Sequence, residues 1–548
     1  MTRTFKETST MNMPANTAND TLDAVVIGAG FAGLYALHRL REMGLNVRGL
    51  EAGSGVAGTW YWNRYPGART DSASEVYQYW FSDELLNDWN WSERFPAQEE
   101  TERYLNFVTD RLKLRPLIRF NSRVASAHWD DTTDLWTVTT DQGESIHCRY
   151  LLSCLGPLSE PKVPPFKGHE NFKGRFLHTS RWPKGGIDLS GKRVGVIGTG
   201  ATGVQVIQTI AGQVGELFVF QRTPTYAIPM RNHALSDEDR ATLRPRYKAL
   251  GEAVKHSLTG FAFDMHPKPW AETTADERRA IFEALYADGS LIMWGGNFAE
   301  VLVDPVANEE LSAFMREKMR ARITKPGVAD KLIPQYGFGT RRPPLDSGYL
   351  EAFNRDNVHL VDLKAAPIEC ITEAGIRTRD GEYPLDIIVL ATGFDAGTGA
   401  INAIDIRGRD GVSLKELWGR DITTAMGLQK HGFPNFFTSA APLAPASAFC
   451  NVPTCLQQQV EWITDCIAHV EKAGTAKVIE ATQAFEDNWV KHHDEVTGAT
   501  LIAKVDSWWT GANIEGKPRR VLSYIHVGNY RQACEDVAQK GYEGFEIR

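Results

Sequence analysis

The sequence contains no C-x-x-C motif, and its cysteines are few. Seven stand in 548 residues, at positions 148, 154, 370, 450, 455, 466 and 534. An odd number without paired spacing argues against a disulfide framework and against a structural zinc site. We therefore expect no bound metal and a reducing, cytoplasmic compartment.

The chain also lacks a long apolar run and an excess of positive charge. No run approaches the roughly 20 apolar residues that cross a bilayer, and the formal net charge at pH 7 is −8. We therefore expect neither a membrane nor a nucleic acid as a partner. Residues 1–22 are polar and have no apolar signal core, which predicts a disordered tail.

What the sequence does contain is two segments typical of a dinucleotide-binding βαβ unit. In residues 23–51 and 193–222, an apolar strand leads into a glycine-rich loop, followed by helical spacing and a second strand. The loops read Gly28-Ala29-Gly30-Phe31-Ala32-Gly33 and Gly198-Thr199-Gly200-Ala201-Thr202-Gly203. A lone G-x-G-x-x-G motif is a weak signal, but a strand before it and a helix after it favour a true site. The predicted fold class is α/β, with two Rossmann-like dinucleotide-binding domains and a helical insertion.

The two units differ at the residue that ends the second strand. In the first unit this residue is Glu51, whose carboxylate can accept both ribose hydroxyls. In the second unit it is Arg222, followed by Thr223, and an arginine there can pair with a 2′-phosphate. We therefore predict FAD at the first site and NADPH at the second. The alternative for Arg222 is a solvated surface cation, which its matching position in the unit disfavours.

The remaining segments divide the chain into domains. Residues 117–155 alternate like antiparallel strands joined by turns, and residues 231–334 carry charge-rich helical patterns without a nucleotide motif. A buried strand over 386–391 ends in Ala-Thr-Gly, which closes a nucleotide domain in many flavoproteins, so we expect the N-terminal domain to be completed late in the chain. The predicted division is a tail over 1–22, an FAD-binding domain over 23–157 and 390–548, an NADPH-binding domain over 158–230 and 335–389, and a helical insertion over 231–334. The last FAD-binding part would include a substrate loop and a C-terminal segment that covers the cofactors.

Two further motifs lie around these units. The segment from Phe172 to Pro183 reads F-x-G-x-x-x-H-x-x-x-W-P, with Gly174, His178 and Trp182 at its fixed positions. Residues 58–71 read G-x-W-x-x-x-x-Y-P-G-x-x-x-D. Both motifs, and their order along the chain, resemble the signatures of the flavin-dependent, single-chain (type I) Baeyer–Villiger monooxygenases.

The resemblance implies a reaction. NADPH would reduce FAD, and the reduced flavin would react with O2 to give a C4a-peroxyflavin that converts a ketone to an ester or lactone. A cyclic ketone is the favoured substrate, and the protein would be a monomer or a weak homo-oligomer. The related flavin monooxygenases that oxidise amines or sulfides usually lack the Trp182-Pro183 pair, but N- or S-oxygenation stays the alternative. A disulfide or quinone reductase is disfavoured because the C-x-x-x-x-C spacing of Cys450 and Cys455 lies far downstream of the first unit. A nucleotide sensor would leave the aromatic and basic motifs unexplained.

The resemblance also assigns roles to single residues. Arg342 is the catalytic cation, because guanidinium stays protonated beside a peroxide anion, and Asp71 would hold it in place. Arg341 would reach the NADP phosphate, Trp508 the cofactor ribose, and His178 is hypothesised to couple movement of the NADPH domain to the flavin site. Without the other motifs, Arg341 and Arg342 would be interpreted as a surface basic pair. Further cofactor-binding residues are Thr59, Trp60, Arg69, Thr70, Tyr77 and Val124, and the substrate pocket would include Phe449 and Val452, of which Phe449 could equally be a core aromatic.

Overall fold

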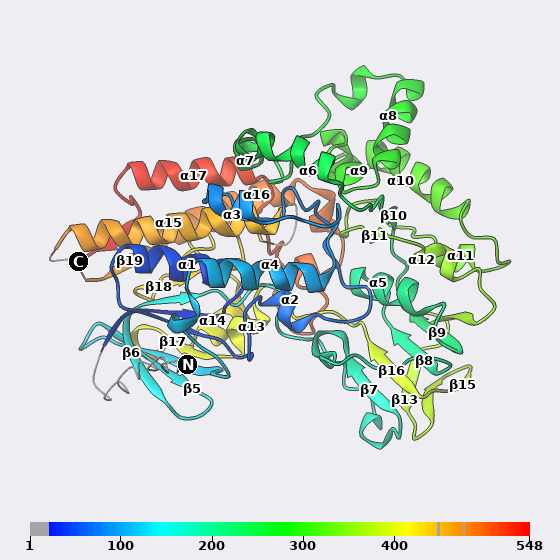
Figure 1. Cartoon of the computed structure of the whole chain (residues 1–548), viewed down its shortest axis with the longest axis horizontal. Helices are drawn as coiled ribbons and strands as arrows, with labels where there is room; N and C mark the ends of the chain where they lie inside the picture. The colour runs from blue at the N-terminus through cyan, green and yellow to red at the C-terminus, as the bar shows by residue number, and fades with distance from the viewer. Residues whose placement is uncertain (1–20, 447–449, 475–476) are drawn as a thin grey trace, which may run out of the picture.

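The computed structural model describes residues 21–446, 450–474 and 477–548, and it forms two lobes, the first built on a mixed sheet and the second on a parallel sheet (Figure 1). The first sheet has the strand order β17-β4-β5-β6-β1-β2-β3, with β18 also paired to β6. Its strands are β1 (Leu22–Ile27), β2 (Val47–Leu50), β3 (Ile118–Arg119), β4 (Val124–Asp130), β5 (Leu135–Thr140), β6 (Ser145–Ser153), β17 (Asp405–Arg407) and β18 (Phe436–Thr438). The predicted antiparallel strands over 117–155 are thus present, as β4, β5 and β6.

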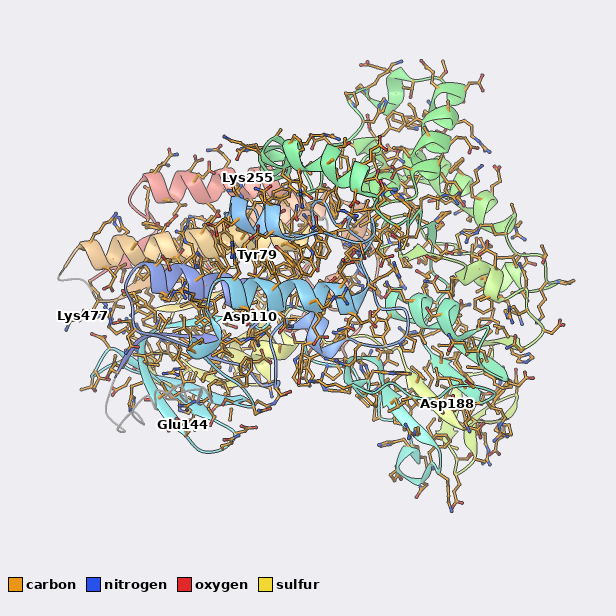
Figure 2. All side chains as sticks on the ribbon, viewed as in Figure 1. Tyr79, Asp110, Glu144, Asp188, Lys255 and Lys477 are labelled. Carbon is orange, nitrogen blue, oxygen red and sulfur yellow. A yellow bond between two sulfur atoms is a disulfide. The ribbon has the colours of Figure 1, made fainter. Side chains whose placement is uncertain are left out.

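Helices cover the first sheet. Helix α1 (Phe31–Glu42) follows the first glycine loop, and the long helix α15 (Val452–Lys472) runs alongside it (Figure 1). Tyr79, labelled in Figure 2, is buried beneath α1 and donates a hydrogen bond from its hydroxyl to the Phe31 carbonyl at 2.6 Å. The other helices are α2 (Thr59–Trp62), α3 (Asp83–Asp88), α4 (Gln98–Arg111), α13 (Gly399–Asn402), α14 (Leu414–Arg420), α16 (Gln483–Gly498) and α17 (Val527–Gln539), and a β19 (Ile479–Ala481) and β20 (Phe545–Ile547) pair lies near the C-terminus.

The second lobe is an all-parallel sheet in the order β12-β9-β8-β16-β7. Its strands are β7 (Arg175–His178), β8 (Arg193–Ile197), β9 (Glu216–Gln221), β12 (Val358–Asp362) and β16 (Ile387–Leu390), and helix α5 (Ala201–Ile210) follows the second glycine loop. Between β12 and β16 stand the antiparallel strands β13 (Ile368–Ile371), β14 (Gly375–Thr378) and β15 (Gly381–Pro384). The strand that ends in Ala-Thr-Gly is β16, so it closes the second nucleotide unit, and β17 and β18 complete the first sheet after it.

The predicted insertion is helical and joins the two lobes along one side (Figure 1). It contains α6 (Asp237–Leu243), α7 (Tyr247–His256), α8 (Ala275–Asp288), α9 (Ile292–Gly295), α10 (Pro305–Arg320) and α11 (Ala329–Leu332), and it is followed by α12 (Tyr349–Ala352) and the β10 (Ile228–Pro229) and β11 (Leu345–Asp346) pair. The expected helix over 237–250 is broken between α6 and α7, because Pro245 cannot donate the hydrogen bond that a continuous helix needs. Helix α7 packs against α17 of the first lobe.

Two sequence-based expectations are corrected. Leu22, placed in the disordered tail, begins β1 and pairs with β6; the rest of the tail prediction, over 1–20, lies outside the described residues. Cys450 and Cys455 form a disulfide, with an S–S distance of 2.05 Å, so the expectation against disulfides is wrong for this pair. The other five cysteines are free. No helix among the residues that the structure describes is long and apolar enough to span a membrane.

The Tyr-Pro-Gly part of the second signature joins the lobes. The Tyr65 hydroxyl donates to the Gln205 side chain on α5 at 2.9 Å, and that side chain donates to the Arg69 carbonyl at 3.1 Å. Gly67 has a φ of +81°, and a Cβ there would lie 2.6 Å from the Gln205 carbonyl oxygen. Only glycine combines this backbone conformation with so close an approach.

Gly67→Ala should therefore weaken the contact between the lobes. Gly44→Ala is a matched control, because Gly44 also has a φ of +81° but has open space around its Cβ position. We expect the control to lose about 1–2 kcal/mol of unfolding free energy from left-handed strain alone, and Gly67→Ala to lose about 1–3 kcal/mol more from overlap with α5. Urea unfolding followed by tryptophan fluorescence measures both; equal losses would contradict the docking role.

Candidate active site

The first glycine loop has the shape of a pyrophosphate cradle. Gly28 has a φ of +100°, and a Cβ there would lie 2.6 Å from the Cys154 carbonyl oxygen. A Cβ on Gly33 would lie 1.9 Å from the Gly28 carbonyl oxygen. Gly30 is the N-cap of α1 and makes no side-chain capping bond, which leaves the helix N-terminus open to an anion. Gly58 approaches the loop so closely that its Cβ would lie 2.9 Å from the Gly30 Cα.

Glu51 stands beside this loop in the position that a ribose requires. Its carboxylate accepts hydrogen bonds from the Ala29 amide at 2.9 Å and from the Gly53 amide at 2.7 Å, and it is 4% exposed. Burial raises the pKa of Glu51, while the two amide donors oppose that rise. The backbone thus holds the carboxylate at the end of β2, and the residues present fit FAD.

The second loop repeats this construction. Gly198 has a φ of +110°, and a Cβ there would lie 2.4 Å from the Ala391 carbonyl oxygen. Gly200 caps α5 without a side-chain bond, and the space beside it is open. A Cβ on Gly203 would lie 2.3 Å from the Gly198 carbonyl oxygen. Because α5 also begins uncapped at a close strand-to-helix turn, the loop fits the pyrophosphate of a second dinucleotide.

Two cations mark the end of this second site. Arg222 is exposed directly after β9, and Thr199 donates from its hydroxyl to the Thr223 carbonyl at 2.9 Å. Lys162, which the sequence motifs did not indicate, lies near enough that Arg222 helps burial lower the pKa of Lys162. Two like charges held close together fit a phosphate better than a neutral ribose.

The predicted flavin-side residues are gathered around the aromatic loop. Trp60, on α2, donates from its indole nitrogen to the Tyr77 hydroxyl at 3.1 Å, and the Tyr77 ring meets Phe31 edge-on at 5.5 Å. Thr59 begins α2, Thr70 is buried and bonds to the Ser72 carbonyl, and Val124 is buried at the start of β4. Arg69 is instead engaged by the Glu93 carboxylate at 3.1 Å and the Phe95 carbonyl at 2.8 Å.

Arg342 and Asp71 meet, although 270 positions of sequence separate them. Nε and Nη2 of Arg342 lie 2.8 and 2.7 Å from the same Oδ2 atom of Asp71. The side chains are 14% and 29% exposed, so the pair is half-buried but reachable. Asp71 follows the segment that docks on the second lobe, and Arg342 follows the insertion. Burial raises the pKa of Tyr65 and of Tyr77, and Asp71 raises both further, so Asp71 lies near both side chains. Tyr65 bonds to α5 of the second lobe and Tyr77 packs on Phe31 of the first loop, so the pair holds its guanidinium where the two lobes meet.

The C-terminal segment closes beside this pair. Arg341 donates to the Asp506 carbonyl at 2.7 Å, and its guanidinium lies 4.9 Å from the Tyr336 ring centre. Trp508 begins a short 3-10 helix, Trp508–Thr510. It lines a cavity of about 10 Å³ with Pro157 and Gly397 among others, which is room for about one water. The segment is thus packed against the first lobe.

The signature segment lies in the second lobe, where it supplies the edge strand β7. His178 ends β7 opposite Leu390 of β16, and its ring meets Phe394 edge-on at 6.0 Å. Nδ1 of His178 accepts from the Ser180 amide at 3.2 Å, and burial lowers the pKa of His178 to about 4, so the ring is neutral at pH 7. Trp182 is 5% exposed in the second-lobe core. The remaining signature positions are Phe172, Gly174, whose Cβ would lie 2.3 Å from the Asp386 carbonyl oxygen, and the exposed Pro183.

The predicted substrate residues are only partly placed. Val452 is the first residue of α15 and is partly buried beside the Cys450–Cys455 disulfide. Phe449 lies outside the described residues. Sequence motifs also missed Trp294 of the insertion, whose ring lies 5.8 Å from Cζ of Arg342. The sequence around Trp294 contains no motif that points to this role, because its contact with Arg342 forms only when the insertion folds.

Comparisons with known proteins agree with this arrangement. The profile of the flavin-binding monooxygenase-like (FMO-like) family matches residues 23–234. The chain is 52% identical over 530 residues to the acetone monooxygenase (methyl acetate-forming) of Gordonia sp. (strain TY-5), a match that covers 96% of this chain and 99% of that relative. A crystal structure of OTEMO in complex with FAD and NADP is 44% identical, with a TM-score of 0.93, and the closed crystal structure of cyclohexanone monooxygenase is 41% identical, with a TM-score of 0.94. Both matches cover 96% of this chain and 99% of the other.

The chain belongs to the Baeyer–Villiger monooxygenases. As a member of this family it is a flavin-dependent monooxygenase, and the predicted fold class and enzyme class are confirmed. The predicted cofactors, FAD and NADPH, are confirmed by the same relationship. The two glycine loops described above have the shape that these two dinucleotides require.

Proposed function

We propose that this Baeyer–Villiger monooxygenase converts a ketone to an ester or lactone at the Arg342–Asp71 pair, with FAD bound in the first lobe and NADPH in the second. The division into domains follows from that placement: 23–157 and 390–548 hold FAD, and 158–230 and 335–389 hold NADPH. When bound, FAD would take a hydride from NADPH and activate O2. Every further step depends on what the chain's own residues hold in place.

The observation that carries the proposal is the fixed cation between the two cradles. Negative charge must develop on oxygen when an oxygen atom is delivered to a carbonyl carbon, and a preoriented guanidinium stabilises that charge. One carboxylate oxygen of Asp71 binds Nε and Nη2 of Arg342 and so fixes the plane of the guanidinium. Because arginine stays protonated at any working pH, the residue stabilises charge without giving up a proton. Arg342 is thus the catalytic residue, and Asp71 holds its orientation.

Arg342→Ala should separate the two halves of the reaction. We expect NADPH to bleach the flavin at a near-normal rate under anaerobic conditions, while ester formation falls roughly 100- to 1,000-fold, the usual cost of losing one such group. Asp71→Asn, which keeps the shape and removes the charge, should give a smaller loss. Arg94→Ala is the control, because it removes another half-buried Arg–Asp pair outside the site. Normal ester yield from Arg342→Ala would refute the assignment.

We propose that Arg222 selects NADPH over NADH, supported by its place after β9 beside Lys162. Arg222→Gln should raise the KM for NADPH about 10- to 100-fold, since a hydrogen bond to a charged group contributes about 1.5–3 kcal/mol. The KM for NADH should not change. Arg193→Gln on β8, an exposed arginine paired with Asp386, is the matched control. Equal changes for both nicotinamides would show that Arg222 does not bind the 2′-phosphate.

We propose that His178 couples movement of the NADPH lobe to the flavin site. Its neutral, buried ring lies at the end of β7 and against Phe394, where the chain passes back from the second sheet toward the first. His178→Ala should slow steady-state turnover much more than it weakens NADPH binding, measured by titration of the reduced or oxidised enzyme. Equal losses in turnover and in binding would rule out this role.

The favoured substrate is a cyclic ketone. The relatives are named for a linear ketone, acetone, and for a cyclic one, cyclohexanone, so NADPH consumption with products identified by mass should be compared for both classes. N- or S-oxygenation is the second candidate, and a sulfide in the same panel tests it. We further propose a cytoplasmic location, supported by the buried free thiols of Cys148, Cys154, Cys466 and Cys534, which cell fractionation would check. We also propose a monomer or weak homo-oligomer, which sedimentation would check.

A further inference from the structure

The helical insertion reaches the catalytic pair through one side chain, Trp294. This residue lies on α9 and is 3% exposed. Its indole ring lies 5.8 Å from Cζ of Arg342, a distance at which a guanidinium is attracted to the face of an indole. Arg342 is thus held by a carboxylate from the first lobe and by an aromatic ring from the insertion.

The backbone before Arg342 is shaped around the same ring. Gly339 has a φ of +77°, and a Cβ there would lie 2.6 Å from both Cδ1 and Nε1 of Trp294. Any other residue at 339 would push the indole away or unbend the turn. The turn that carries Arg342 therefore depends on Trp294 for its position, in addition to the contact at the guanidinium.

Trp294 also contacts the C-terminal segment. Its ring stacks on Trp509, with centroids 5.5 Å apart and planes at 11°. Trp509 is 1% exposed and follows Trp508 directly, and its amide donates to the Ser507 hydroxyl oxygen, which caps the short 3-10 helix. The series of contacts Trp509–Trp294–Arg342–Asp71 thus links the C-terminal segment to the proposed catalytic cation.

We propose that Trp294 is a positioning residue that orients Arg342 together with Asp71, and that Trp509 of the C-terminal segment supports Trp294 in turn. This inference rests on the proposed role of Arg342. Without the indole, Arg342 would keep Asp71 but lose the aromatic support for its guanidinium. The consequence is that oxygen transfer to the ketone would become less efficient, and more of the NADPH and O2 consumed would end as hydrogen peroxide.

Trp294→Leu tests the proposal, because leucine fills part of the volume but has no aromatic face. We expect ester formed per NADPH consumed to fall about 2- to 30-fold, the range for a cation–π contact, with a matching rise in hydrogen peroxide. Anaerobic reduction of the flavin by NADPH should stay near normal. Trp294→Phe should retain most of the ester yield. Trp270→Leu is the matched control, since Trp270 is another insertion tryptophan with an arginine, Arg278, 4.4 Å from its ring.

A double-mutant cycle identifies the partner. Arg342→Lys keeps the charge and removes the flat guanidinium, so Trp294→Leu should cost less ester yield in that background than in the native one. Additive losses would overturn the proposal, as would unchanged ester yield in Trp294→Leu. A raised KM for the ketone with unchanged ester per NADPH would also overturn it, because Trp294 would then be a wall of the substrate pocket.

The experiments distinguish the catalytic role of Arg342 from the positioning role of Trp294. If Arg342→Ala forms ester normally, the catalytic role of Arg342 fails and this inference fails with it. If Arg342→Ala loses ester and Trp294→Leu does not, only the positioning role fails. Flavin content and melting temperature show whether Trp294→Leu folds. If it does not, the same double-mutant cycle is run with Trp294→Phe, and a smaller loss of ester yield is then compared between the native and Arg342→Lys backgrounds.

Discussion

The ion pair of Arg342 and Asp71 is the interaction on which the rest of the site depends. Its two members lie 271 positions apart in the chain, and each is held in place by a different long-range contact. Asp71 follows the Tyr65–Gly67 segment that docks on α5, and Arg342 follows a turn packed on the insertion. Because a short bidentate contact tolerates little displacement, the pair forms only when the first lobe, the second lobe and the insertion are all in register.

This constraint explains why glycines matter at places far from the nucleotides. Within each loop, glycine allows the strand-to-helix turn and leaves the helix N-terminus open. Gly67 and Gly339 lie outside these loops. Gly67 lets the backbone after Tyr65 approach α5, and Gly339 lets the turn before Arg342 pack against the indole of Trp294. All are close-approach positions, but only those in the loops belong to the familiar nucleotide motif. Gly67 and Gly339 instead help to set the positions of Asp71 and Arg342 relative to the two loops.

Sequence reasoning succeeded where local pattern determines structure. Both glycine loops, the strands before them and the acid or base that ends each unit lie where the spacing predicted, because strand, turn and helix in a βαβ unit are fixed by neighbouring residues. The pairing of Arg342 with Asp71 also agreed with expectation, although it was inferred from resemblance. Lys162, Trp294 and the Cys450–Cys455 disulfide were not predicted. The contacts of Lys162 and Trp294 depend on segments that are distant in the sequence. The disulfide depends on where α15 begins, and an odd total of cysteines does not exclude one bond between two nearby cysteines.

The F-x-G-x-x-x-H-x-x-x-W-P segment gains a physical meaning from its place in the fold. It contains β7, the edge strand of the second sheet, and Trp182 is buried in the second-lobe core. Gly174 fits against the Asp386 carbonyl at the start of β16, and His178 lies beside the chain that returns after β16. The described contacts of His178 are with Ser180 and Phe394, and neither side chain is one to which we assign a part in the reaction. The described contacts of the signature therefore build the edge of the second sheet and its junction with the chain after β16, and they give the segment a structural part to play apart from the Arg342–Asp71 pair.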